Sequence, residues 1–453
     1  MVVVFAAVAT LTLHGQRPAF SVVEASISEM RDALVQRRAT SVEIVTRYLT
    51  RIATYDGRLH AALAVNPAAL REAAERDRER ALGRVRGPLH GIPIAVKDNI
   101  NTTDMPTTGG ALALEGFIPP YEATLVANLK AAGAVVIAKT GMTELANWVA
   151  GDPTPMPTNY NALGGFAFNP YDPRRDPRPE YVDGRPALAT GGSSSGVGTA
   201  ANFWAGSVGT ETSGSILNPS NQTMLVGLKP TVGRISRYGV IPITADQDTP
   251  GPMAKWVSDV AIMLGALEGA SPDPNDPATQ ACAPAPRRDY TVFLKADALK
   301  GARIGIPRAY YYEPTTAPGT ATFEGGLPAP KAAVMAEAIE VLRRQGATVV
   351  DPADIPSIVD RDPGENLLLW DPCSGVSARR GRDAGCSTVL KYGMKRDFNA
   401  WLASLGATAP VKTLSDLRRW NFLHRSAGSL KYGRANLDIS DEMDVVRDRA
   451  TPR

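Results

Sequence analysis

Two serine–glycine clusters lie within residues 191–216, GGSSSGVGTAANFWAGSVGTETSGSI. A serine hydroxyl becomes an effective nucleophile only when a base takes its proton. The segment contains no histidine, and its one carboxylate, Glu211, stands alone. The base for such a serine must therefore come from another part of the chain.

Two familiar glycine motifs overlap the first cluster. Residues 192–196 match the G-x-S-x-G nucleophile elbow, which needs a preceding strand and a later aspartate and histidine. Only His424 follows the motif. The residues before the motif are rich in proline and asparagine, which is typical of a loop rather than a strand. Residues 196–201 match a loose dinucleotide-binding fingerprint, again without the strand that it requires. The sequence therefore argues against both interpretations.

Lysine is another base that pairs with serine in enzymes. It must be neutral, which requires burial or a nearby cation to lower its pKa from about 10.4. Lys97 ends the apolar run GIPIAVK, which predicts a buried strand. A lysine at the end of a strand also commonly extends to solvent, so this run alone leaves both roles open.

A series of ordered motifs is more specific: GPLHGIPIAVKDNI from residue 87, GGSSSG from residue 191 and GTETSGSILNPSNQTMLVGLKP from residue 209. Over about residues 23–345 the chain resembles the amidase signature family. The resemblance implies an α/β fold with a mixed, largely parallel central sheet covered by helices on both faces. It also implies hydrolysis of a carboxylic amide through an acyl-enzyme, with esters and carbamates as further substrates of the same chemistry.

The family's serine–serine–lysine triad corresponds by resemblance to Lys97, Ser193 and Ser215. Lys97 takes a proton from Ser193, which takes one from Ser215, the nucleophile. In the family the bridging serine follows a cis peptide bond. The spacing from Ser193 to Ser215 is 22 positions, which is shorter than is usual in the family.

The same resemblance implies further site residues. The oxyanion would be held by the backbone N–H groups of Thr212, Ser213, Gly214 and Ser215. Ser194 is expected to support the triad, and Ser195 to cap the helix that follows. Glu211 is expected to tie down the turn, while Asn147 and Trp148 border the site, Trp148 mainly by packing.

The organisation of the chain follows from composition and from the resemblance. We expect residues 1–22 to be a signal or disordered leader and residues 23–453 to form one amidase signature domain. Its parts would be helical (23–85), catalytic (86–270) and C-terminal (289–453), the last shortened relative to the family.

Local signals within the domain predict an α/β arrangement. The patterns S-x-x-E at 26–29 and T-x-x-E at 40–43 are capping boxes that predict helix starts. Gly133 and Gly346 each end a helical pattern and precede a β-branched run, which predicts helix–glycine–strand units. Residues 152–190 are predicted to form a long loop.

Composition narrows the function. The 453 residues carry a net charge of +3, with bases and acids interleaved rather than arranged in a basic stripe, which argues against nucleic-acid binding. No apolar run is long enough for stable membrane insertion. The expected partner is a small-molecule amide, with no cofactor and no metal; a homodimer, a secreted or periplasmic location and a cytoplasmic one all stay open.

Three cysteines, Cys282, Cys373 and Cys386, are too few and too scattered for a disulfide scaffold or a thiolate metal site. Cys373 and Cys386 pair only if the protein is exported, and two free thiols are the alternative.

Two other functions fit the same motifs. One is the glutaminase subunit of a tRNA-dependent amidotransferase, against which the signal-like N-terminus and the loop at 152–190 argue. The other is an inactive member of the family, suggested by the short C-terminal part. Labelling of a serine by a fluorophosphonate distinguishes an enzyme from the inactive alternative.

Overall fold

Helices open the described part of the chain. The computed structural model describes residues 20–151, 154–281, 283–369, 371–372 and 386–446. The first helices are α1 (Ile27–Val35), α2 (Ser41–Leu59) and α3 (Ala69–Ala81). Ser26 and Thr40 each accept the backbone N–H of the glutamate three residues on, whose side chain bonds back to the cap. Both predicted capping boxes are thus confirmed.

A six-stranded sheet occupies the centre, in the order β1–β3–β2–β6–β8–β7. Its strands are β1 (Ala62–Val65), β2 (Pro93–Lys97), β3 (Val135–Thr140), β6 (Gly206–Glu211), β7 (Val226–Gly227) and β8 (Thr249–Ala254). β2 is parallel to both β3 and β6, whereas β1 and β8 run antiparallel to their neighbours. Four of the six strands point the same way, so the predicted mixed, largely parallel sheet is confirmed.

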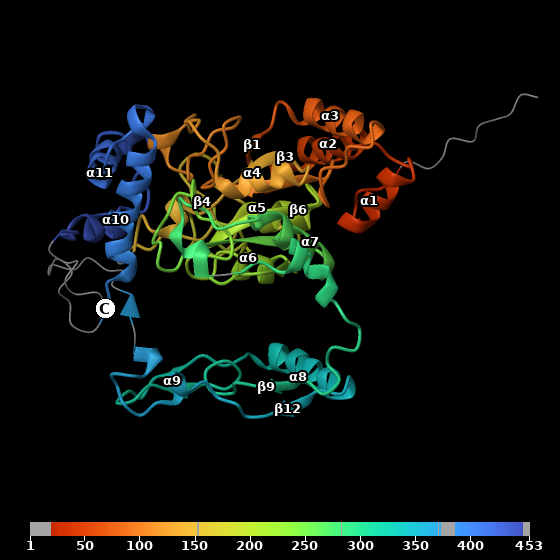
Figure 1. Cartoon of the computed structure of the whole chain (residues 1–453). Helices are drawn as coiled ribbons and strands as arrows, with labels where there is room; N and C mark the ends of the chain where they lie inside the picture. The colour runs from red at the N-terminus through yellow and green to blue at the C-terminus, as the bar shows by residue number, and fades with distance from the viewer. Residues whose placement is uncertain (1–19, 152–153, 282, 370, 373–385, 447–453) are drawn as a thin grey trace, which may run out of the picture.

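Helices cover both faces of this sheet (Figure 1). They include α4 (Thr124–Ala131), α5 (Ser194–Ala200), α6 (Leu217–Gln222) and α7 (Val257–Leu267). α4 contacts α7, and α5 contacts α6. Every residue of β2 and β3 is buried, as expected for parallel strands that are covered on both sides.

Gly133 joins α4 to β3 in a left-handed conformation, with φ of 92°. A Cβ atom there would lie 2.6 Å from the Cα of His90, so no larger residue fits. Gly346 has φ of 91° and stands between α8 (Ala329–Arg344) and β12 (Thr348–Val350). The two predicted helix–glycine–strand units are therefore confirmed.

The described part of the predicted 152–190 loop is irregular apart from a short hairpin, β4 (Tyr160–Asn161) and β5 (Gly165–Phe166). The last helices are α10 (Val389–Ser404), α11 (Leu414–Leu423) and α12 (Ala435–Asp441), which pack against one another. None of the described helices is both long and apolar enough to cross a bilayer.

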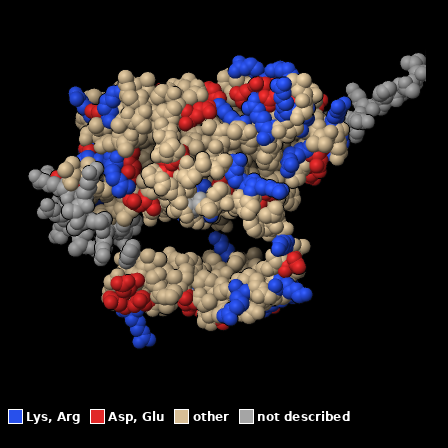
Figure 2. All heavy atoms as spheres, in the orientation of Figure 1, with Lys and Arg blue, Asp and Glu red and all other residues tan. Residues whose placement is uncertain are grey.

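A small unit lies apart from the main sheet (Figure 1). It contains α8, β9 (Arg303–Gly305), β10 (Thr315–Thr316), β11 (Phe323–Glu324), β12 and α9 (Pro356–Val359). β9 and β12 form a two-stranded parallel sheet. Figure 2 shows an open gap between this unit and the main body, and basic and acidic side chains intermixed on the visible face.

A second two-stranded parallel pair, β13 (Asp371–Pro372) with β14 (Cys386–Ser387), precedes α10. Cys373 lies outside the described residues, so whether it pairs with Cys386 stays a prediction; most of the predicted leader also lies outside them.

Candidate active site

Lys97 is the last residue of β2 and has no solvent exposure. Its Nζ donates to the backbone oxygen of Thr210 at 3.1 Å and to Thr210 Oγ1 at 3.0 Å, across the neighbouring strand β6. Burial lowers the pKa of Lys97 to about 8, although the carboxylates of Asp248 and Glu211 oppose the shift. The sequence left open whether Lys97 is buried or extends to solvent, and in the structure it is buried.

Ser193 is fully buried and caps α5, because its Oγ accepts the N–H of Ser195 at 3.1 Å. The expectation that Ser195 is the cap is wrong, since the helix begins at Ser194. The peptide bond before Ser193 is trans, so the cis bond implied by the family resemblance is absent. The capping bond holds Ser193 Oγ against the first turn of α5.

Ser215 is half-buried in the loop between β6 and α6. A Cβ on Gly192 would lie 2.9 Å from Ser215 Oγ, so this glycine allows the two serine–glycine clusters to approach each other. Glu211 Oε2 accepts the N–H groups of Ile216 at 2.7 Å and Leu217 at 2.9 Å. The expected role of Glu211, tying down the turn, is confirmed.

The three expected triad residues converge on one edge of the sheet without joining. Lys97 ends β2, Ser193 precedes α5, and Ser215 follows β6. Among the hydrogen bonds of the described residues, none links any two of these three side chains. The structure therefore brings Lys97 to Thr210 and Ser215 to Gly192, but it does not form the contacts of a proton relay.

A cavity of about 320 Å³ opens beside Ser215. Its wall comes from the loop after β3, from the β6–α6 loop and from the C-terminal helices, and includes Thr143, Asn147, Gly192, Thr212, Ser213, Gly214, Ser215, Leu390 and Asn436. No Asp, Glu, Lys or Arg of the described residues lines it. The described wall is thus uncharged, with hydroxyl and amide groups set among apolar side chains.

The expected oxyanion donors line this cavity. Gly214 adopts φ of 85°, which turns the chain between β6 and Ser215. None of the hydrogen bonds found among the described residues is donated by the N–H groups of Ser213, Gly214 or Ser215. These donors are therefore available to a bound group.

Ser194 lies next to the expected triad but bonds away from it. Its Oγ donates to Asn159 Oδ1 at 3.1 Å, and Asn159 Nδ2 donates to Thr190 Oγ1 at 3.0 Å. Ser194 therefore connects α5 to the loop that was predicted at 152–190.

Asn147 and Trp148 lie in a backbone segment of unusual shape. Leu145, Ala146 and Asn147 all have positive φ, of 43°, 57° and 72°. Trp148 is buried, and its Nε1 donates to Ser440 Oγ of α12 at 2.8 Å. Trp148 therefore packs, as expected, and also joins this wall of the cavity to the C-terminal helices.

Several site residues were missed by sequence reasoning. Thr210 receives Lys97, and its Oγ1 also accepts Asn99 Nδ2 at 3.0 Å. Lys139 is the last residue but one of β3, and its Nζ lies 3.6 Å from Asp98 Oδ1 in a fully buried ion pair. The parallel pattern of two apolar runs that each end near a lysine was a signal for this second amine.

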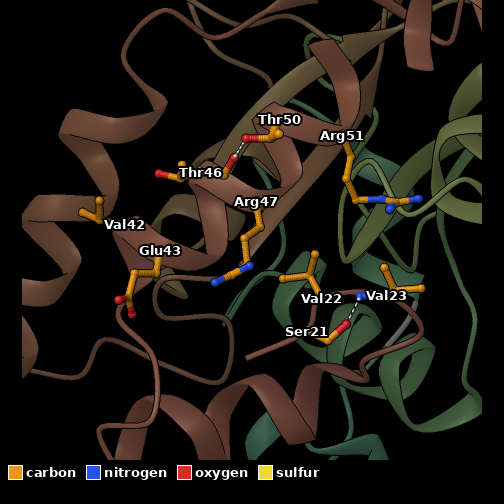
Figure 3. A pocket seen from close by; sticks show the side chains of 9 residues that line it. All are labelled: Ser21, Val22, Val23, Val42, Glu43, Thr46, Arg47, Thr50 and Arg51. Carbon is orange, nitrogen blue, oxygen red and sulfur yellow. Dashed lines mark hydrogen bonds between the residues drawn. The ribbon is translucent and has the colours of Figure 1, made fainter. Parts of the chain in front are cut away.

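A larger cavity of about 530 Å³ lies beside α2 (Figure 3). Among the residues labelled there, Thr50 Oγ1 donates to the Thr46 oxygen at 2.8 Å. The guanidinium of Arg51 donates to the backbone oxygens of Ala201 and Asn202, both at 2.8 Å. Because none of the described residues that line this cavity is a lysine or a histidine, it is not the candidate site. The described residues contain no cluster of three or more potential metal ligands.

Comparison with known proteins connects this geometry to a family. Residues 43–363 match the amidase family. A probable amidase of Arabidopsis thaliana is 34% identical over 89% of this chain and 69% of its own length. A glutamyl-tRNA(Gln) amidotransferase subunit of Thermosynechococcus vestitus is 40% identical over 82% of this chain and 70% of its own length.

A solved structure agrees with these sequence relatives. The peptide amidase of Stenotrophomonas maltophilia superposes with a TM-score of 0.75 and 36% identity, covering 94% of this chain and 78% of that chain. The α/β fold and these relatives place the chain in the class of amide hydrolases. The chain belongs to the amidase family, often called the amidase signature family.

Proposed function

We propose that the protein hydrolyses a carboxylic amide through a Ser215 acyl-enzyme, with Ser193 as proton relay and Lys97 as base. The observation that carries this proposal is Lys97: a fully buried amine that forms no ion pair with any described residue. Burial lowers the pKa of this amine to about 8, so a larger share of it is neutral near pH 7 than of a solvated lysine, and the neutral form is the one that accepts a proton.

The hydrogen-bonding capacity of Lys97 supports the base role. A neutral amine has two N–H donors and one lone pair. The two Thr210 oxygens are acceptors for both donors. The lone pair is then free for the hydroxyl proton of Ser193.

Ser193 has the complementary capacity. Its Oγ accepts one N–H, from Ser195, so a second lone pair can accept the hydroxyl proton of Ser215. The relay needs Ser193 to contact both Lys97 and Ser215, and catalytic hydrogen bonds of this kind often tighten only in the substrate complex. When Ser215 Oγ attacks the amide carbon, its proton passes to Ser193 and the Ser193 proton to Lys97.

The remaining steps use the free N–H groups of the β6–α6 loop. The negative charge that develops on the carbonyl oxygen would be held by the backbone of Thr212, Ser213 and Gly214, with Ser215 itself. Ser193 returns a proton to the leaving nitrogen as the C–N bond breaks. Water then attacks the acyl ester, and the released acid restores Ser215.

The cavity wall favours an uncharged substrate. Free glutamine carries an ammonium and a carboxylate, and the described wall offers no charged side chain for either. Neutral amides such as capped peptide amides fit this wall better. For this reason we favour the function of an independent amidase over that of a glutaminase subunit.

Ammonia release from a panel of neutral amides and from glutamine tests the proposal. We expect release from at least one neutral amide, labelling by a fluorophosphonate, and loss of both in Ser215→Ala. Ser415→Ala is the matched control, because Ser415 is an exposed serine on α11 that bonds Asp441. Labelling that persists in Ser215→Ala would overturn the assignment of the nucleophile.

A further inference from the structure

Asp248 is a buried carboxylate that bonds two walls of the active-site cavity. Its Oδ1 accepts the hydroxyl of Thr212, and its Oδ2 accepts the N–H groups of Ile243 at 2.9 Å and Thr244 at 3.0 Å. Thr212 and Ile243 both line the cavity beside Ser215. One side chain, 7% exposed, therefore holds the oxyanion loop against the segment that precedes β8.

No described cation pairs with this carboxylate. Three charged groups face the Asp248 carboxylate: Lys97 from β2, Arg237 from the loop between β7 and β8, and Asp397 from α10. Arg237 is taken by Asp276, with Nε to Oδ2 at 2.9 Å. Burial raises the pKa of Asp248 to about 7, and repulsion by the carboxylate of Asp397 adds to the shift.

Asp248 also reaches a second cavity. This space of about 340 Å³ is lined by Asp248 together with Tyr121, Tyr238 and Trp401, and it shares no lining residue with the cavity beside Ser215. The carboxyl group thus has a route for proton exchange that does not pass through the substrate. Asp248 therefore lines the second cavity and, through its bonds to Thr212 and Ile243, also holds the wall of the cavity beside Ser215.

We propose that Asp248 is a positioning residue whose ionised form holds Thr212, and with it the oxyanion site, and whose protonation through the second cavity turns the enzyme off. The inference rests on the proposed amide hydrolysis. The ionised carboxylate accepts all three donors with its two oxygens. A protonated carboxyl must donate from one oxygen, so either Thr212 reverses its bond or a backbone N–H loses its acceptor.

The pH dependence of kcat/KM for a neutral amide tests the proposal. Two protons must be lost for activity, one from Lys97 and one from Asp248, so the logarithm of kcat/KM in the wild type should fall with slope two below about pH 7. In Asp248→Asn we expect a maximum about tenfold lower. Its acidic limb should have slope one and lie at lower pH, because the carboxylate that raised the pKa of Lys97 is gone.

Thr212→Val separates positioning from a purely structural effect. It removes the hydroxyl that Asp248 holds but keeps the backbone N–H, so it should reproduce the loss and the slope of one. The double variant Asp248→Asn/Thr212→Val should lose no further activity. Asp276→Asn, a buried carboxyl of the same second cavity that bonds Arg237, should keep the slope of two.

The outcomes separate this inference from the function on which it rests. A wild type without amidase activity would overturn both. An active wild type whose limb keeps slope two in Asp248→Asn, or an Asp248→Asn with unchanged activity, would overturn the inference alone. Circular dichroism and thermal melting of each variant identify those that fail to fold, for which Thr212→Val supplies the decisive profile.

Discussion

Lys97 shows how one residue joins stability to function. Its amine lies between two buried strands, where the charged form loses its hydration. The same burial that destabilises the folded protein supplies a base near neutral pH. If Lys97 is kept for its chemistry, its replacement by an apolar residue should make the protein more stable.

Lys97→Met is predicted to lower turnover by at least about a thousandfold and to raise the melting temperature at pH 7. The pKa of Lys97 falls from about 10.4 unfolded to about 8 folded, so the folded state binds fewer protons between these values. The resulting destabilisation, up to about 3 kcal/mol, is fully present below pH 8 and disappears as the pH rises to about 10.4. Calorimetry at pH 7 and pH 10 should find the gain of Lys97→Met larger at pH 7.

A melting temperature of Lys97→Met below that of the wild type at both values would contradict this account. Lys97→Arg is the matched control, because it keeps a permanent charge in the same place. It should lose both activity and stability.

The turn that follows β6 illustrates positioning by a secondary-structure element. β6 delivers Glu211 at its last position, and Glu211 reaches across the loop to the first N–H groups of α6. A carboxylate at a helix start accepts free donors and faces the positive end of the backbone dipoles. Glu211 thereby ties the end of β6 to the start of α6, on the two sides of the loop that carries Ser215.

Glu211→Gln should loosen this loop. The amide oxygen of glutamine can still accept both N–H groups, but it lacks the negative charge that strengthens these hydrogen bonds. We therefore expect a loss of about 1–2 kcal/mol in the free energy of unfolding. The predicted kcat falls about tenfold with a smaller change in KM, because the loop holds groups that act on the transition state. Urea unfolding and steady-state kinetics measure the two effects; a change in KM alone would contradict the positioning role.

Local signals explain how much of these elements was predictable. The capping boxes at 26–29 and 40–43, Gly133 and the apolar run before Lys97 each depend on neighbours within a few residues. Thr210 could not be recognised as the partner of Lys97, because 113 positions separate them.

The candidate site was predictable in its residue types but not in its contacts. The two serine–glycine clusters were recognisable, yet the bond from Ser193 to Ser195 and the link from Asp248 to Thr212 depend on packing between distant loops. Trp148 and Ser440, 292 positions apart, likewise meet only through the fold. Polar residues in irregular loops follow no period, so the sequence holds no pattern that would pair them.

At the scale of the whole molecule, burial divides the chain unevenly. β2 and β3 are buried at every position, whereas β9 and β12 have no buried residue and α8 has only Ile339. Apolar side chains remain on the surface of the small unit, with Val334 65% and Phe323 72% exposed. Because the two-stranded sheet of β9 and β12 and the helix α8 bury so little apolar area, we expect this unit to be only weakly stabilised.

Hydrogen exchange should therefore report two levels of stability. Amides of β9, β12 and α8 are predicted to exchange through local opening at a free energy at least about 2 kcal/mol below that of β2 and β3. Opening of the small unit exposes little new apolar surface, so its exchange should respond weakly to urea, whereas exchange in β2 and β3 should respond strongly. Native-state exchange at several urea concentrations, read by mass spectrometry, measures both quantities. Equal opening free energies and equal urea slopes in the two sheets would mean that the small unit unfolds only with the main sheet.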